Sequence, residues 1–251
     1  SSDVCSSDLR TSPAAPPNPR ARPPRILPMP PASLLTAATL LAAQAVVVVL
    51  LLSGTSPVLL PVTADFGGGI QLTAVNLGVA AVTLLVFSAL CRAIDAVRPS
   101  PVIRWVEWSQ VSGIVVFLVA QFNGVTDVAA LVALYAITAG ASLFLVLHET
   151  AAEPRWPFSF GAAVAIVPWG VIAFYQVGAI VAGGDPALLV RVLTIALLLL
   201  ASAYWYDARL ARVKGRLVIA ERAHTILTTL TVSVLAWAVV VGSQVVVYTA
   251  L

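Results

Sequence analysis

Seven long apolar runs, separated by short polar stretches, dominate the pattern of this chain. Each run has about 20 residues or more, which is the length a helix needs to cross the hydrocarbon core of a bilayer. Transmembrane β-strands would instead alternate apolar and polar positions over segments of about ten residues. The pattern therefore predicts seven membrane-spanning helices, at residues 33–53, 71–91, 101–121, 128–147, 158–182, 186–206 and 224–250.

Two of these predicted helices carry a start signal. Ser100-Pro101 and Asp185-Pro186 each offer a capping side chain followed by a proline. Proline is well placed in the first helical turn because its missing N–H would have no partner there. We therefore expect the third and sixth helices to begin at these two dipeptides.

The first 31 residues differ from everything that follows. They are rich in serine, proline and arginine and hold too few apolar side chains to form a core, so residues 1–31 are predicted to be a disordered tail. Residues 1–9 resemble translated sequencing-adaptor DNA, which suggests the hypothesis that they are an artefact. A single membrane domain is predicted over residues 32–251.

Composition supports the membrane assignment. Of the 251 residues, 60% are hydrophobic and 10% are charged, with a mean hydropathy of +0.98. An average soluble domain is about 45–50% apolar and about 25% charged. These values exclude a soluble globular protein, a disordered protein and an ordinary nucleic-acid-binding protein. The lipid bilayer is the expected surrounding, and no nucleic acid is expected as a partner.

The basic residues predict an orientation. Thirteen of the 14 lie in the tail or at the helix ends on the same side as the tail, and Arg191 alone lies on the other side. Basic residues concentrate on the cytoplasmic face of a membrane protein. We therefore predict a multi-pass protein of the cell membrane with a cytoplasmic N-terminus and an external C-terminus. Arg191 is expected to extend to the outer surface.

Glu107 is the leading candidate for a functional side chain. It lies about six residues into the third predicted helix, where an ionisable group is costly and often marks a functional site. One interpretation is that its carboxylate faces an interior pocket. The other is that Glu107 lies near the cytoplasmic surface and pairs with Arg104, one turn earlier.

The remaining titratable groups indicate neither a metal site nor an enzyme. His148 and His224 fall at cytoplasmic helix ends without further ligands at metal-binding spacing. Glu149 and Glu221 lie at the same level and are expected to be solvated. The chain has no recognisable nucleophile–base set or phosphate-binding motif, so we do not expect it to be an enzyme.

Several separated motifs resemble those of the heliorhodopsins. Residues 104–109, RWVEWS, resemble the RWVEYS motif of that family, with tryptophan in place of tyrosine at position 108. Residues 157–158 and 166–169 resemble PF and IVPW. Residues 221–222 and 235–237 resemble the family's GER and LAW. The resemblance covers most of the chain from the first span onward, and it implies an all-α, rhodopsin-like bundle of seven helices.

The resemblance also implies roles for individual residues. The family cofactor is retinal, bound as a protonated Schiff base, and Glu107 would correspond to its counterion. The resemblance further implies a homo-oligomer, specifically a dimer. The chromophore pocket would be lined by Ser109, Ser112, Pro168, Trp169 and Trp237.

The chain departs from the family at the retinal-attachment site. The family's lysine stands five residues before the tryptophan that corresponds to Trp237, and here that position is Val232. The neighbouring Thr231 and Ser233 also lack an amine. The single lysine, Lys214, lies between the sixth and seventh spans on the predicted cytoplasmic side. We therefore expect no covalently bound retinal, and we predict no cofactor.

Polar residues around the site are altered as well. The family's histidines in the first two spans correspond to Leu41 and Arg92, and its asparagine in the fourth span corresponds to Thr138. Without an imine, Glu107 is left either to become neutral or to pair with Arg104 or Arg92.

These features lead to two functional hypotheses. The first is a heliorhodopsin-like membrane protein that cannot form a retinal Schiff base. It would act through an unknown protein partner, as a light-independent or regulatory member. The alternative is a membrane protein that binds or transports a non-covalent apolar ligand, such as retinal or a carotenoid.

Overall fold

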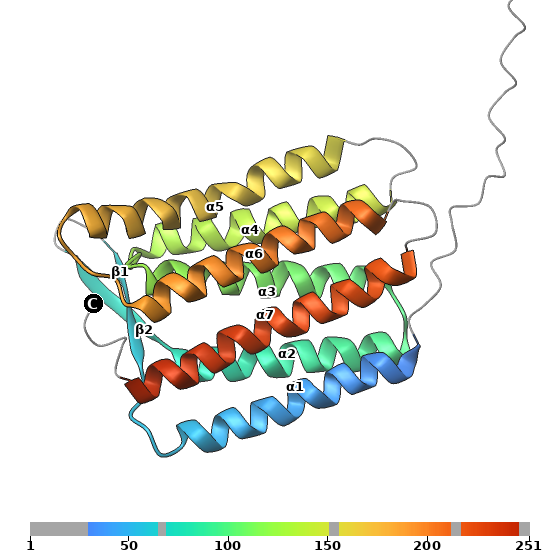
Figure 1. Cartoon of the computed structure of the whole chain (residues 1–251), viewed down its shortest axis with the longest axis horizontal. Helices are drawn as coiled ribbons and strands as arrows, with labels where there is room; N and C mark the ends of the chain where they lie inside the picture. The colour runs from blue at the N-terminus through green and yellow to red at the C-terminus, as the bar shows by residue number, and fades with distance from the viewer. Residues whose placement is uncertain (1–29, 65–68, 151–155, 212–216, 246–251) are drawn as a thin grey trace, which may run out of the picture.

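A computed structural model describes residues 30–64, 69–150, 156–211 and 217–245. The described residues form seven helices, each long and apolar enough to cross a membrane, and one two-stranded sheet (Figure 1). The predicted all-α, seven-helix bundle is confirmed. The helices are α1 (Pro31–Leu52), α2 (Leu77–Val97), α3 (Pro101–Phe122), α4 (Val128–Thr150), α5 (Trp156–Val181), α6 (Leu188–Ala211) and α7 (Leu217–Val245).

Helix α3 lies at the centre of the bundle. It packs against α2 and α4 and also contacts α5, α6 and α7 (Figure 1). Its spanning segment is more buried than that of any other helix, and its apolar side chains join those of α2 and α7 in one core. A polar side chain in the first half of α3 is therefore placed between helices rather than in lipid.

The second apolar run contains a strand as well as a helix. Residues 59–64 form β1 (Leu59–Ala64), which pairs antiparallel with β2 (Ile70–Asn76). The prediction of a helix from residue 71 is therefore wrong, because α2 begins only at Leu77. A short apolar run does not distinguish a strand from a helix. The switch falls at Asn76, whose side chain caps α2 by accepting a hydrogen bond from the N–H of Val79 at 3.1 Å.

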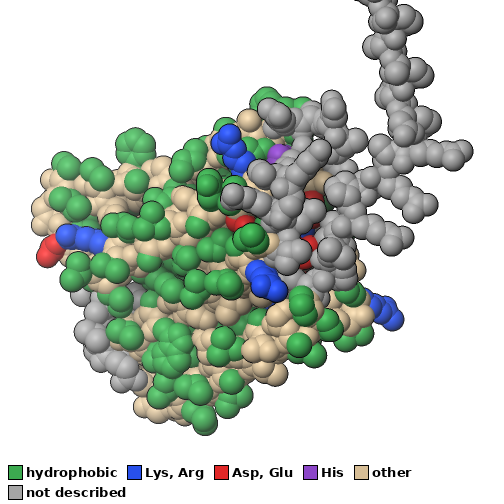
Figure 2. Space-filling view, turned by 45° about the vertical axis from the view of Figure 1, so that its right-hand side comes forward, with side chains coloured by type: hydrophobic (Ala, Val, Ile, Leu, Met, Phe, Trp, Pro, Cys, Tyr) green, Lys and Arg blue, Asp and Glu red, His purple; other side chains and the backbone are tan. Residues whose placement is uncertain are grey.

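The two ends of the bundle differ in character. We call the end that carries β1 and β2 the hairpin end, and the opposite end, where α2 meets α3, the polar end (Figure 1). Green hydrophobic side chains cover most of the helix faces in Figure 2, while several charged side chains gather beside the grey segments. The outward-facing helix surfaces thus match a hydrocarbon environment. Which end faces the cytoplasm stays a prediction.

The predicted start of α3 is confirmed with a different cap. Pro101 is the first residue of the helix, but the hydroxyl of Ser100 makes no capping hydrogen bond. Instead, the backbone N–H of Ser100 donates to Asp95 Oδ1 at 2.9 Å. The short connection between α2 and α3 is thereby held by the end of α2.

Other predicted boundaries shift by a few residues. Helix α6 begins at Leu188 rather than at residue 186, because the carboxylate of Asp185 forms an ion pair with Arg191 instead of capping the helix. Helix α7 begins at Leu217, seven residues before the predicted start. The tail predicted at residues 1–31 lies outside the described residues, except for its last two prolines, and Pro31 opens α1.

Close packing of α5 against its neighbours gives a testable prediction. A Cβ added at Gly161 would lie 2.7 Å from Phe144 Cβ and 2.8 Å from the Trp205 ring, whereas one added at Gly170 would meet nothing within 4 Å. Overpacking of a core costs about 1–3 kcal/mol. We expect Gly161→Val to lower the midpoint of thermal unfolding in detergent, followed by circular dichroism.

Gly170→Val on the same helix is the matched control, and it should leave the midpoint nearly unchanged. Equal midpoints for the two variants would contradict the described packing of α4, α5 and α6.

Candidate functional site

A buried ion pair joins α2 to α3. Arg92 Nη2 lies 3.1 Å from Glu107 Oε2, and both side chains are 1% exposed. The other terminal nitrogen of Arg92, Nη1, donates a hydrogen bond to Thr225 Oγ1 on α7 at 3.3 Å. Glu107 thus faces the interior, as one of the two interpretations expected. The alternative partner Arg104 is excluded by this geometry, because Arg104 is engaged elsewhere.

This ion pair is incompletely hydrogen-bonded. Glu107 Oε1 and Arg92 Nε are buried and have no hydrogen-bond partner among the described residues. Removing two charges from water costs several kcal/mol per ion, and mutual attraction repays this only when the geometry is excellent. The pair is therefore weak evidence for stability.

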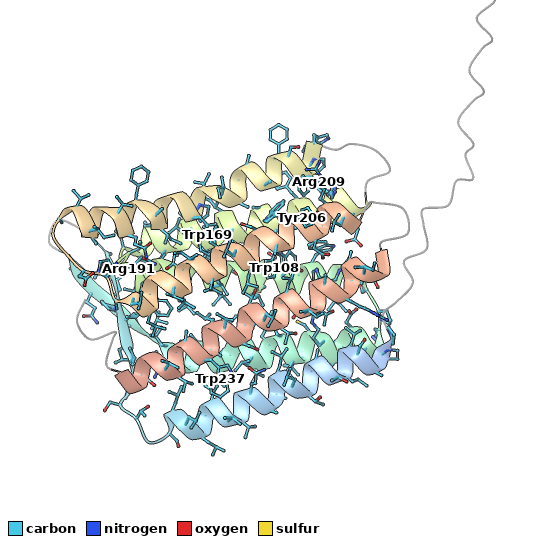
Figure 3. All side chains as sticks on the ribbon, in the orientation of Figure 1. Trp108, Trp169, Arg191, Tyr206, Arg209 and Trp237 are labelled. Carbon is cyan, nitrogen blue, oxygen red and sulfur yellow. The ribbon has the colours of Figure 1, made fainter. Side chains whose placement is uncertain are left out.

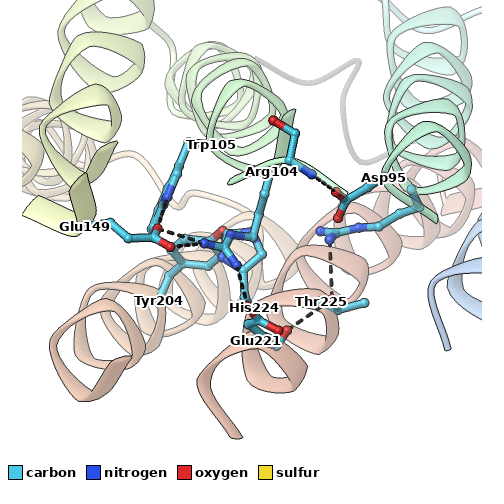
Figure 4. Close-up of polar contacts among 10 residues, drawn as sticks. Asp95, Arg104, Trp105, Glu149, Tyr204, Glu221, His224 and Thr225 are labelled. Atoms are coloured by element: carbon cyan, nitrogen blue, oxygen red, sulfur yellow. Dashed lines mark hydrogen bonds and ion pairs between the residues drawn. The ribbon is translucent and has the colours of Figure 1, made fainter. Parts of the chain in front are cut away.

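A second ionic cluster lies at the polar end of the bundle (Figure 4). Arg104 Nη2 lies 2.6 and 2.7 Å from the two carboxylate oxygens of Glu149 on α4, and Nη1 lies 3.6 Å from Glu221 Oε1 on α7. The indole of Trp105 also donates to Glu149. The expectation that Glu149 and Glu221 are solvated is wrong. Both are largely buried, because α4 and α7 bring them to Arg104.

An aromatic layer separates the polar end from the middle of the bundle. The ring of Trp108 stacks on Tyr204 of α6, with ring centroids 3.5 Å apart and planes 5° apart. The hydroxyl of Tyr204 is hydrogen-bonded to the ring of His224 on α7, and Trp105 contacts both rings edge-on. His148 packs against Phe158 on α5. Both histidines are therefore buried among aromatic rings.

Four of the five residues assigned to the chromophore pocket lie inside the bundle. Ser109 donates to the carbonyl of Ala139, and Ser112 is hydrogen-bonded to Ser142, each at 3.0 Å. Pro168 and Trp169 are buried on α5. In Figure 3, Trp108 and Trp169 lie in the central part of the bundle, away from both ends.

These residues enclose little space. A central cavity of about 20 Å³ is lined in part by Trp108, Ser112, Thr138, Trp169 and Thr231. One water-sized probe occupies about 10–15 Å³, whereas pockets for small organic ligands span about 300–1,000 Å³. In this structure the interior is therefore packed with side chains. The stacked rings of Trp108 and its α6 neighbour occupy much of it.

Trp237 does not line this cavity, contrary to expectation. Its side chain is 40% exposed, and its indole donates to Gln44 Oε1 of α1 at 3.2 Å (Figure 3). Helical geometry explains the difference. Val232 points into the core, and five residues along a helix turn the side-chain direction by about 140° from it.

Val232 is fully buried in an apolar part of α7. It is 0% exposed and belongs to the same core cluster as Leu235 and Ala236. The position that would carry the retinal-binding lysine thus presents a hydrocarbon side chain without a nucleophile. Lys214 lies outside the described residues.

A polar network near the hairpin end was missed by sequence reasoning. Gln176 Nε2 on α5 donates to Asn123 Oδ1 at 3.1 Å, and Asn123 Nδ2 donates to Thr194 Oγ1 on α6 at 3.0 Å. A glutamine within an apolar span was the available signal. Arg191 lies at the same end, partly exposed and ion-paired, in agreement with its expected direction (Figure 3).

Fold and site together define a seven-helix membrane protein with an internal arginine–carboxylate pair. The heliorhodopsin family model matches residues 33–244, which is most of the chain. The chain therefore belongs to the heliorhodopsin family. A search of curated proteins finds no match.

The buried pair makes a prediction about stability. Arg92→Met leaves Glu107 buried without its cation, and breaking a buried pair in this way costs about 3–5 kcal/mol. We expect a marked drop in the thermal unfolding midpoint in detergent, and the double variant Arg92→Met/Glu107→Leu should recover most of it. Arg209→Met, at an exposed arginine of α6, is the control. A midpoint for Arg92→Met equal to that of the control would show that the pair does not form.

Proposed function

We propose that this heliorhodopsin works without a retinal Schiff base, as a light-independent regulatory or interaction protein of the membrane. One observation carries the proposal. The Arg92 guanidinium lies 3.1 Å from Glu107, the carboxylate that by resemblance would balance the protonated imine, and both groups are 1% exposed. The counterion position thus already has a cation supplied by the protein itself.

Two further features support this function. An imine needs a primary amine, and Val232 supplies none at the attachment position. The central cavity of about 20 Å³ leaves no room for a polyene without rearrangement of side chains such as Trp108. The missing amine, the internal cation beside Glu107 and the small central cavity each disfavour a retinal Schiff base.

The proposed role is not enzymatic. The buried carboxylates of Glu107, Glu149 and Glu221 each lie in an ion pair with an arginine. Signalling by such a protein requires a protein partner, whose identity is unknown. A second copy of the chain is the partner that family resemblance suggests. The orientation with a cytoplasmic N-terminus is part of the proposal.

The alternative function, binding or transport of a non-covalent apolar ligand, has one observation in its favour. A cavity of about 350 Å³ lies at the hairpin end, outside the site that resembles the chromophore pocket. A ligand such as retinal or a carotenoid has no comparable space in the middle of the bundle. Native mass spectrometry of a detergent extract separates the two functions, because only the alternative predicts a co-purifying apolar molecule.

The first prediction concerns retinal itself. All-trans retinal titrated into the purified protein should give no absorption band beyond that of free retinal, because none of the described residues is a lysine. Borohydride reduction should give no covalent adduct by mass spectrometry. A shifted band together with a trapped adduct would refute the proposed function.

The second prediction restores the missing amine. Val232→Lys should form an adduct that borohydride traps, with side chains such as Trp108 displaced to admit the polyene. Adding Arg92→Gln should raise the fraction of protonated imine by freeing Glu107. Val232→Arg is a control that adds a charge without a reactive amine. If Val232→Lys forms no adduct but Val232→Lys/Trp108→Tyr does, the packed interior blocks retinal as effectively as the missing lysine.

A further inference from the structure

A cavity of ligand size lies at the hairpin end, away from the ion pair. It has a volume of about 350 Å³, against about 20 Å³ for the central cavity. The end of α1, the connection from α1 to β1, the start of α2 and the last part of α7 surround it. Its volume falls within the range of about 300–1,000 Å³ that is typical of ligand pockets.

The lining of this cavity is amphipathic. Leu52, Val79, Val82 and Val239 provide apolar walls from three different helices. Polar side chains cluster where α1 ends and α2 begins, at Ser53, Thr55, Ser56 and Asn76. Such a cavity suits a molecule with an apolar body and one polar end.

The polar end of that molecule is expected to be uncharged. None of the fourteen lining residues carries a charge. An ionic group placed here would lack a counter-charge near the hydrocarbon region, which is unfavourable. The hydroxyls of Ser53 and Thr55 already bond to backbone carbonyls, whereas Ser56 and Thr83 are exposed hydroxyl residues of the lining. Two hydroxyls are thus available to a ligand hydroxyl.

The cavity opens sideways, toward the surroundings of the bundle. Val49 and Val79 line it and are 49% and 62% exposed. Both belong to helices that are long and apolar enough to span a membrane. A molecule dissolved in the bilayer therefore reaches the cavity directly from the hydrocarbon phase.

Two contacts define the spacing of its walls. Gly78 lets the start of α2 approach the end of α1, because a Cβ there would lie 2.9 Å from Leu52 Cδ1. The hydrogen bond from Trp237 to Gln44 joins α7 to α1 closer to the middle of the bundle. Gln44 lies eight residues, about 12 Å, before Leu52 along α1. Contacts of α1 with α2 and of α1 with α7 thus fix the distance between the helices that line the opening.

We propose that this cavity binds a neutral long-chain alcohol, with an alkyl or isoprenoid chain between the helices and the hydroxyl among Ser56, Thr83 and Asn76. The inference does not rest on the loss of the Schiff base. It gives the apolar-ligand alternative a location and a chemical class of ligand.

Photolabelling tests the proposal directly. The full chain is placed in phosphatidylcholine nanodiscs with a diazirine-bearing hexadecanol, irradiated, and mapped by mass spectrometry. Labels should concentrate on peptides from the end of α1, the start of α2 and the last part of α7. Unlabelled hexadecanol should compete for them, and hexadecanoate, whose end is charged, should compete less well.

A pair of matched variants separates the cavity from general lipid contact. Val79→Trp fills the cavity from an exposed position and should reduce labelling about tenfold, which corresponds to about 1.4 kcal/mol of binding. Val86→Trp replaces another exposed valine of α2 that does not line the cavity. It should label like the wild type. Thr83→Val should weaken competition by hexadecanol, because it removes a hydroxyl that can hydrogen-bond the ligand.

Four results would overturn the proposal. The first is equal labelling of Val79→Trp and Val86→Trp. The second is equal labelling by a phosphatidylcholine that carries the same diazirine chain, which would assign the cavity to ordinary bilayer lipid. The third is labelling that appears only after removal of residues 246–251, which would assign it to the end of the chain itself. The fourth is equal competition by hexadecanol and hexadecanoate. The retinal titration tests the proposed function separately from all of these.

Discussion

The cost of placing a charge in an apolar bundle shapes this protein. Glu107 lies on the most buried helix, where an uncompensated carboxylate is strongly unfavourable. Arg92 compensates it from α2 and reaches α7 through Thr225, so three helices are connected around one pair of charges. The same rule operates at the polar end, where Arg104 draws together carboxylates from α4 and α7.

This arrangement divides the bundle into layers with different chemistry. The polar end is ionic, the layer above it is aromatic, and the middle is packed with apolar side chains around Val232. Described residues line a cavity of ligand size at the hairpin end and another in a groove between α3 and α4. The heliorhodopsin fold of this chain thus holds an arginine beside Glu107 in its interior.

Several of these features were predictable from local patterns. The apolar runs located all seven helices, and the motif around Glu107 indicated the family. Whether Glu107 faces the interior or pairs with Arg104 near the surface was left open by the sequence. The hairpin was missed, because residues 70–76 form a strand that continues into the apolar run of α2. Trp237 was assigned to the pocket by motif alone, although its direction on α7 depends on helical phase.

The sequence by itself determined the membrane class, the number of spans, the absence of an amine at Val232 and the family, because apolar length and motif spacing are local properties of the chain. The tertiary structure decided which arginine pairs with which carboxylate. Arg104 is near Glu107 in the chain, yet Glu107 pairs with Arg92 and Arg104 pairs with Glu149. Side-chain partners depend on how helices distant in sequence pack together, and that packing also forms the cavity at the hairpin end.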